Sequence, residues 1–194
     1  MTSLLDQPVR GFLDQVAART PAPGGGVAAA VTGAMAAGLV AMAARFSATR
    51  MPGASDLADQ ADELRRRLDQ LADMDARAYA AVLDAGRQLG DDGQRRERMR
   101  EALLGAALVP LEIAGIGVEV ALMAARLAEA GNPNLRGDAV TGAVLAAASA
   151  RSAACLVDIN VGLGGLDSGL SRRAAQAAAD AADAAAAAAG DYGG

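Results

Sequence analysis

The sequence has no histidine and no tryptophan, a single cysteine, and aromatic residues at only 2% of its 194 positions. Without histidine, a serine–histidine–aspartate triad and a cysteine–histidine pair are excluded, and so are the usual histidine and cysteine sites for zinc. A lone cysteine, Cys155, also excludes a disulfide within the chain, fits a reducing compartment and is expected in the core. Any acid–base chemistry must therefore use Asp, Glu or Tyr.

Positive charge is scarce as well. The net charge is -5 and the pI is near 4.7, so the chain lacks the concentrated basic surface that nucleic acid requires, and we expect no nucleic-acid partner. The dense basic cluster of Arg95, Arg96, Arg98 and Arg100 is either a solvated helix face or a patch for an acidic ligand tail. No charged segment followed by an apolar run and a cleavage site opens the chain, which favours a cytoplasmic location.

The length favours a single domain over residues 1–194. Apolar residues make up 53% of the chain, most of them alanine at helical spacing, and no segment alternates like a strand. We therefore expect an all-α, single-domain bundle of about six or seven helices. The expected helices cover residues 8–19, 27–44, 56–89, a stretch after residue 93 that Pro110 kinks or splits, 138–161 and 167–189.

A Pro/Gly loop, Pro21 to Gly26, opens directly into the charge-free stretch from Val27 to Ala44. This pattern predicts a helix N-terminus whose first N–H groups lack partners within the helix and attract polar ligand groups. The stretch approaches the length of a membrane span. Because alanine and glycine insert weakly, no aromatic belt flanks the stretch and no other segment matches it, we expect instead a buried Ala/Gly-rich central helix and no membrane partner.

Asp75 is the first candidate for chemistry. It lies on the apolar stripe of its own helix, four residues after Leu71 and seven after Leu68, so its carboxylate faces the core or a cleft. Burial raises a carboxyl pKa and makes the group a usable acid or base near neutral pH. The alternative is a structural carboxylate held by an arginine or by helix-end donors.

Asn132, Asn134 and Asp138 surround a loop that opens another apolar helix. Such side chains can hold a ligand by paired hydrogen bonds, but capping the helix and closing the turn is their commoner role. Asn160, near the end of that helix, is a further polar residue among apolar neighbours and a candidate to face inward.

Three separated stretches carry a family resemblance: Pro21–Gly26 with the helix after it, Asp75–Tyr79, and Gly131–Asn134 with Asp138. Together they resemble the formiminotransferase-cyclodeaminase C-terminal family, which includes bacterial stand-alone methenyltetrahydrofolate cyclohydrolases. The resemblance runs from about Phe12 to Asn160. It implies an all-helical homodimer that uses no metal and no cofactor beyond its tetrahydrofolate substrate.

Members of this family hydrolyse 5,10-methenyltetrahydrofolate to 10-formyltetrahydrofolate, or cyclise 5-formiminotetrahydrofolate with loss of ammonia. The resemblance favours the first reaction here, because no formiminotransferase domain is attached. It implies that Asp75 and Asp138 are the catalytic residues. The substrate-binding residues that it implies are Pro23, Gly24, Gly25, Gly26, Tyr79, Asn132, Asn134 and Asn160.

The chain departs from the family pattern at Val27 and Gly137, where the family usually has serine, and at Leu156, where it usually has asparagine. Each change removes a hydrogen-bonding group from the expected pocket. Two alternatives therefore stand beside the enzyme: a diverged protein that binds folate without turnover, and a helical oligomerisation protein.

Overall fold

A computed structural model describes residues 3–88 and 91–190, which form six α-helices and one short 3-10 helix, with no strand among them. The elements are α1 (Val9–Ala17), α2 (Gly25–Arg45), α3 (Ala54–Arg87), α4 (Asp92–Ala130), η1 (Pro133–Leu135), α5 (Arg136–Gly164) and α6 (Ser168–Ala189). The predicted all-α bundle is confirmed. Leu89, the expected end of the third helix, lies outside the described residues.

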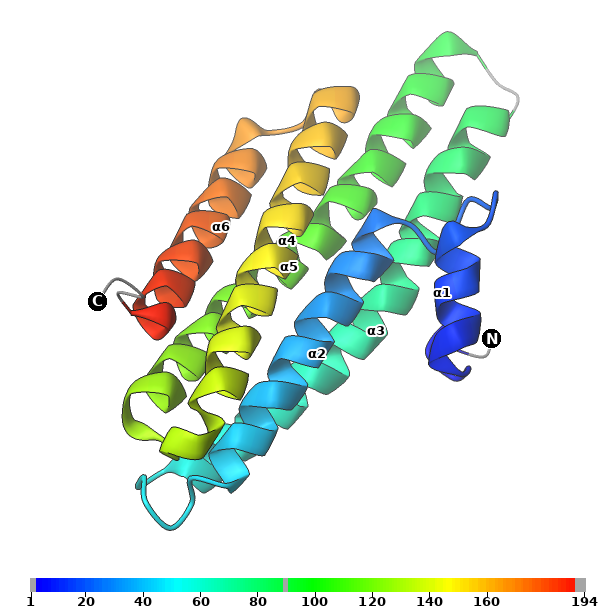
Figure 1. Ribbon diagram of the computed structural model, residues 1–194. Helices are drawn as coiled ribbons and strands as arrows, with labels where there is room; N and C mark the ends of the chain where they lie inside the picture. The colour runs from blue at the N-terminus through cyan, green and yellow to red at the C-terminus, as the bar shows by residue number, and fades with distance from the viewer. Residues whose placement is uncertain (1–2, 89–90, 191–194) are drawn as a thin grey trace.

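The long helices run side by side, and their connections gather at the two ends of the bundle (Figure 1). α2 packs between α3 and α5, while α6 covers α4 and α5. The α2–α3 and α4–α5 loops meet at one end, where the N–H of Asn132 donates to Ser47 Oγ at 2.8 Å. Toward the opposite end, the start of α2 and the last turns of α5 meet the second half of α3 and the first half of α4.

Small residues let the central helices approach closely. Ser149 Oγ on α5 donates to the Ala29 carbonyl on α2 at 2.7 Å, and a Cβ on Gly33 would lie only 2.8 Å from that hydroxyl oxygen. On the other side of α5, a Cβ on Gly117 of α4 would lie 2.9 Å from Ala150 Cβ. Packing of this kind uses the high alanine and glycine content instead of large interlocking side chains.

Of the two effects predicted for Pro110, a kink or a split, the split is wrong, since α4 runs from Asp92 to Ala130 without a break. The helix α2 is buried along most of its length, as predicted, but not on every side, because Met35 is 54% exposed. The prediction that Cys155 lies in the core is wrong, because Cys155 is exposed on α5.

Three segments are long and apolar enough to cross a membrane, judged by length and composition alone: Gly25–Arg45, Asp92–Ala130 and Pro133–Gly164. The expectation that no other segment matches the apolar stretch of α2 is therefore wrong. In the folded chain, 61% of the apolar window of α2 is buried against other parts of the protein, so much of its apolar surface already has a protein partner.

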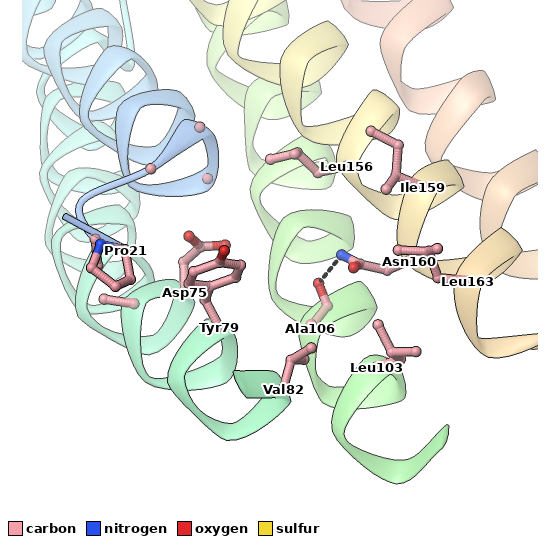
Figure 2. Close-up of a pocket in the computed structure, with 15 residues that line it drawn as sticks. Pro21, Asp75, Tyr79, Val82, Leu103, Ala106, Leu156, Ile159, Asn160 and Leu163 are labelled. Carbon is pink, nitrogen blue, oxygen red and sulfur yellow. Dashed lines mark hydrogen bonds between the residues drawn. The ribbon is translucent and has the colours of Figure 1, made fainter. Parts of the chain in front are cut away.

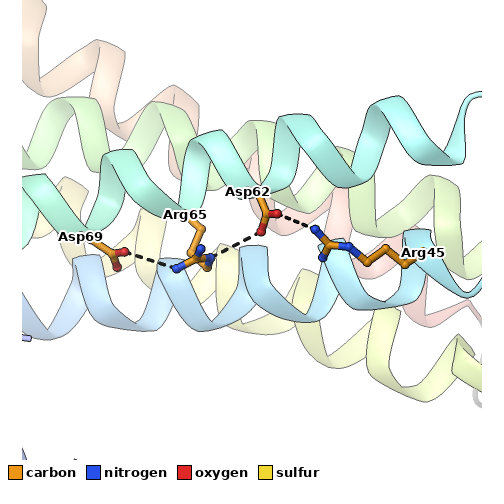
Figure 3. A network of polar contacts seen from close by, with 4 residues as sticks. All are labelled: Arg45, Asp62, Arg65 and Asp69. Atoms are coloured by element: carbon orange, nitrogen blue, oxygen red, sulfur yellow. Dashed lines mark hydrogen bonds and ion pairs between the residues drawn. The ribbon is translucent and has the colours of Figure 1, made fainter.

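A run of charges on α2 and α3 links these two helices near the far end of α2 (Figure 3). Arg45 contacts Asp62 with a nitrogen–oxygen distance of 2.5 Å, and Arg65 bridges Asp62 and Asp69 at 3.5 and 3.4 Å. The hydrogen bond from Arg45 lowers the pKa of the Asp62 carboxyl, whereas burial raises the pKa of Asp69. Of these three pairs, Arg45–Asp62 joins α2 to α3 and the other two lie within α3. Because all of them are partly exposed to solvent, they add little stability.

Candidate active site

A cavity of about 380 Å³ lies at the end of the bundle where α2 begins (Figure 2). Its walls come from the Pro/Gly loop and the first turn of α2, from α3, from α4, and from the last turns of α5. The lining residues are Pro21, Ala22, Gly24, Gly25, Gly26, Asp75, Ala76, Tyr79, Val82, Leu103, Ala106, Leu156, Ile159, Asn160 and Leu163. Segments from four parts of the chain thus converge on one hollow.

The Asp75 carboxylate sits directly against the first turn of α2. A Cβ built on Gly26 would overlap the carboxylate, so only glycine leaves room for it there. The Val27 backbone acts on the same carboxylate and lowers its pKa, so Asp75 faces the start of α2, which has no side-chain cap of its own. Asp75 therefore lies against a helix end and also borders a cavity, which combines the two interpretations from the sequence.

Burial raises the pKa of the Asp75 carboxyl, and the interaction with the Val27 backbone opposes that rise only in part. A carboxyl group with a raised pKa exchanges protons closer to neutral pH than an exposed one. Val27 itself contributes only its backbone to this contact, since its side chain is fully buried. The valine at this position therefore leaves the Asp75 contact intact.

Tyr79 lies one helical turn after Asp75 and borders the same cavity. On the opposite side, Asn160 of α5 donates from Nδ2 to the Ala106 carbonyl of α4 at 2.8 Å. The prediction that Asn160 faces inward is therefore confirmed. The polar groups of the cavity stand on two facing walls.

The remaining wall is apolar, and of its side chains the sequence pointed only to Leu156, as a departure from the family pattern. It is formed by side chains of α3, α4 and α5: Val82, Leu103, Leu156, Ile159 and Leu163. Ile159 and Leu163, in the last turns of α5, are 54% and 71% exposed. Apolar residues on the outer face of a helix end are the sequence pattern from which this wall could have been predicted. Such a wall suits a flat ring system and lowers the dielectric around Asp75.

The structure does not bring the Asn132 group to this cavity. Asn132 accepts from the Asn134 N–H at 3.0 Å and donates to the Phe46 carbonyl at 3.2 Å, so it closes the loop at the far end of the bundle. Asp138 and Asn160 are 22 residues apart on α5, or about 33 Å along its axis. The expectation of one pocket shared by Asp75 and Asp138 is wrong within a single chain, because α5 spans the whole bundle.

Two other predicted features also lie away from the cavity. Pro23 is buried behind the loop and does not line the hollow. Arg95 and Arg96 line a separate hollow of about 410 Å³ at the α3–α4 hairpin, together with Gly86, Asp92 and Met99. Within residues 3–88 and 91–190, no three His, Cys, Asp or Glu side chains are grouped as metal ligands.

Comparison with known proteins gives consistent matches. Residues 8–180 match the family model described as formiminotransferase-cyclodeaminase. A methenyltetrahydrofolate cyclohydrolase of Methylorubrum extorquens is 35% identical over 80% of this chain and 79% of that protein. The mouse formimidoyltransferase-cyclodeaminase is 36% identical over 58% of this chain but only 23% of its own length. A formiminotetrahydrofolate cyclodeaminase of Thermotoga maritima has a TM-score of 0.84 and 27% identity, with 94% of both chains covered.

Proposed function

Because the chain belongs to the formiminotransferase-cyclodeaminase family, we propose that it is a folate one-carbon enzyme that hydrolyses 5,10-methenyltetrahydrofolate to 10-formyltetrahydrofolate. The observation that carries this proposal is the half-buried Asp75 carboxylate, held against a glycine helix start inside a largely apolar cavity. The cyclohydrolase of Methylorubrum extorquens supports this reaction, since this chain covers 79% of it.

The methenyl group is an amidinium cation whose bridging carbon accepts water directly. Asp75 stabilises the cation, takes a proton from the attacking water, and returns it to the ring nitrogen as the carbon–nitrogen bond breaks. The hydroxyl proton of the adduct leaves to solvent as the formyl C=O forms. The N–H groups of Gly25 and Gly26 lack partners within α2 and are placed to hold a substrate oxygen. This chemistry needs no metal and no redox cofactor.

The test is loss of the methenyl absorbance at mildly acidic pH, where spontaneous hydrolysis is slow. Wild-type protein is expected to accelerate it, and Asp75→Asn to lower kcat by about 10²- to 10⁴-fold, the usual contribution of a positioned acid–base group. Full activity in Asp75→Asn would overturn the assignment. A rise in melting temperature with folate but without turnover would indicate a binding protein instead.

Formiminotetrahydrofolate cyclodeaminase is the second candidate, favoured by the structural similarity to the Thermotoga maritima enzyme. The same carboxylate serves either reaction, because both form or break a carbon–nitrogen bond at the same bridging carbon. Ammonia release from 5-formiminotetrahydrofolate, measured beside methenyl hydrolysis on one preparation, separates the two reactions by their kcat/KM values.

The proposal includes a homodimer in the cytoplasm, paired through the outer face of α2 and α5. This face has no charged residue from Gly25 to Ala44 or from Ala139 to Ala150. Met35 and Val144, on adjacent helices, are 54% and 52% exposed. A second copy of the chain fits this face, because an uncharged apolar surface that follows two long helices is typical of permanent interfaces.

A twofold axis across the middle of this face would exchange the two ends of the bundle. Asp138 of the partner subunit, with Asn134, would then approach the cavity that contains Asp75. Such pairing reunites the residues that the sequence assigned to one site and that lie toward opposite ends of the bundle in the single chain.

Subunit mixing tests this arrangement. Asp75→Asn and Asp138→Asn homodimers are each expected to be inactive, whereas unfolding and refolding them together should restore about a quarter of wild-type activity, because half of the dimers are mixed and each has one intact site. No recovery, with mixed dimers shown by mass spectrometry, would contradict the shared site.

A further inference from the structure

Proline inside a helix leaves one backbone carbonyl without its usual donor, because it has no N–H group to bond the residue four positions earlier. Pro110 is fully buried within α4, so the carbonyl left over is that of Ala106. Ala106 borders the active-site cavity. A buried carbonyl of this kind requires a donor from elsewhere.

Asn160 supplies that donor. Its Nδ2 lies 2.8 Å from the Ala106 oxygen, and the side chain reaches from α5 across to α4 (Figure 2). The orientation of the amide is fixed by chemistry, since a carbonyl oxygen can accept from the NH₂ group but not from Oδ1. This contact satisfies the carbonyl that Pro110 leaves without a helical donor.

From these contacts we infer that Pro110 is a positioning residue, which through the Ala106 carbonyl orients the Asn160 amide so that it offers the cavity its oxygen. Without the proline, the N–H of residue 110 would bond Ala106, and the Asn160 amide could present either end. With the proline in place, Asn160 Oδ1 is a hydrogen-bond acceptor in the cavity, as the Asp75 carboxylate is.

A ligand that binds against the Asn160 side of the cavity must present N–H donors along the edge that faces Asn160. An aminopyrimidinone ring, with an amino group beside a ring N–H, has such an edge, whereas a ring that offers only carbonyl oxygens does not. This choice of ligand rests on the proposed folate function. The orientation of Asn160 does not, so the two parts can be tested separately.

Orientation is tested by thermal unfolding without ligand, for wild type, Pro110→Ala, Asn160→Asp and the double variant. Asn160→Asp alone should lower the melting temperature strongly, because it sets a carboxylate against the Ala106 carbonyl. The same change should cost clearly less in the Pro110→Ala background, where the backbone N–H returns to Ala106. Additive losses would overturn the inference. If Asn160→Asp does not fold, Asn160→Ala completes the same cycle, since it too removes the donor to Ala106.

Ligand recognition is tested by steady-state kinetics with methenyltetrahydrofolate. Pro110→Ala should raise KM by roughly threefold to tenfold, the worth of one neutral hydrogen bond, with kcat changed less than about twofold. Val109→Ala is the matched control, because it truncates the neighbouring buried residue without changing any helical hydrogen bond. An unchanged KM in Pro110→Ala, or an equal rise in both variants, would overturn the role in recognition. If wild type shows no turnover, the proposed function fails while the unfolding cycle still decides the orientation.

Discussion

A single methyl group at Gly26 should displace the Asp75 carboxylate. In the folded protein, a Cβ at this position overlaps both carboxylate oxygens and the carbon between them. The added Cβ overlaps the carboxylate that is proposed for catalysis. Either this carboxylate or the start of α2 must therefore move to remove the overlap. Gly26→Ala therefore perturbs the site without changing any ionisable residue.

The expected losses follow from what Asp75 must give up. Asp75 loses its favourable interaction with the Val27 backbone. Overpacking at such a contact costs about 1–3 kcal/mol of unfolding free energy. Because a misplaced acid–base group no longer reaches the substrate, kcat should fall by about 10²-fold or more.

The two preceding glycines are matched controls within the same turn. A Cβ on Gly25 would come no closer than 3.8 Å to Leu156, and one on Gly24 would meet no heavy atom within 4 Å. Gly24 and Gly25 line the cavity, so changing either to alanine can change KM. The kcat of each variant should stay within about threefold of the wild-type value, which corresponds to less than about 1 kcal/mol of activation free energy.

The assay is methenyl hydrolysis followed by absorbance, with urea unfolding of each variant. A Gly26→Ala protein that keeps kcat within about threefold of wild type would refute the reasoning, because the carboxylate could then not lie against Gly26 during turnover. Equal kcat losses in all three variants would also refute it, since only one of the three positions is crowded.

Two further predictions concern stability. The raised pKa of Asp75 means that the folded protein binds this proton more tightly than the unfolded chain, so ionising Asp75 costs stability as the pH rises above about 4. Asp75→Asn should therefore raise the melting temperature at pH 7 and have little effect near pH 4, and an equal shift at both pH values would contradict this. Gly33→Ala should lower the unfolding free energy by about 1–3 kcal/mol, because its Cβ would crowd Ser149 Oγ at 2.8 Å and Leu68 Cδ1 at 3.1 Å. Gly105→Ala, exposed on α4 with no heavy atom within 4 Å, should instead raise it by about 0.5–1 kcal/mol, and equal urea midpoints for the two would contradict the packing argument.

The sequence alone predicted the helices and the carboxylate that borders the cavity. Apolar residues at helical spacing predicted an all-α bundle, and the position of Asp75 on the apolar stripe of α3 predicted a carboxylate turned toward a cleft. The three glycines predicted a helix start open to a polar group. These features depend on residues within a few turns of one another, where the rise and twist of a helix fix the geometry.

Which helix ends meet was decided only by the tertiary structure. The direction of each helix in the bundle puts Asn160 of α5 across the cavity from Asp75 and carries Asp138, which is also on α5, to the opposite end. It also brings the Asn160 amide to the carbonyl that Pro110 leaves free, so that a proline expected to kink or split the helix lies inside a continuous one. Such pairings join residues far apart in the sequence, and their positions depend on how whole helices pack, which no local pattern records.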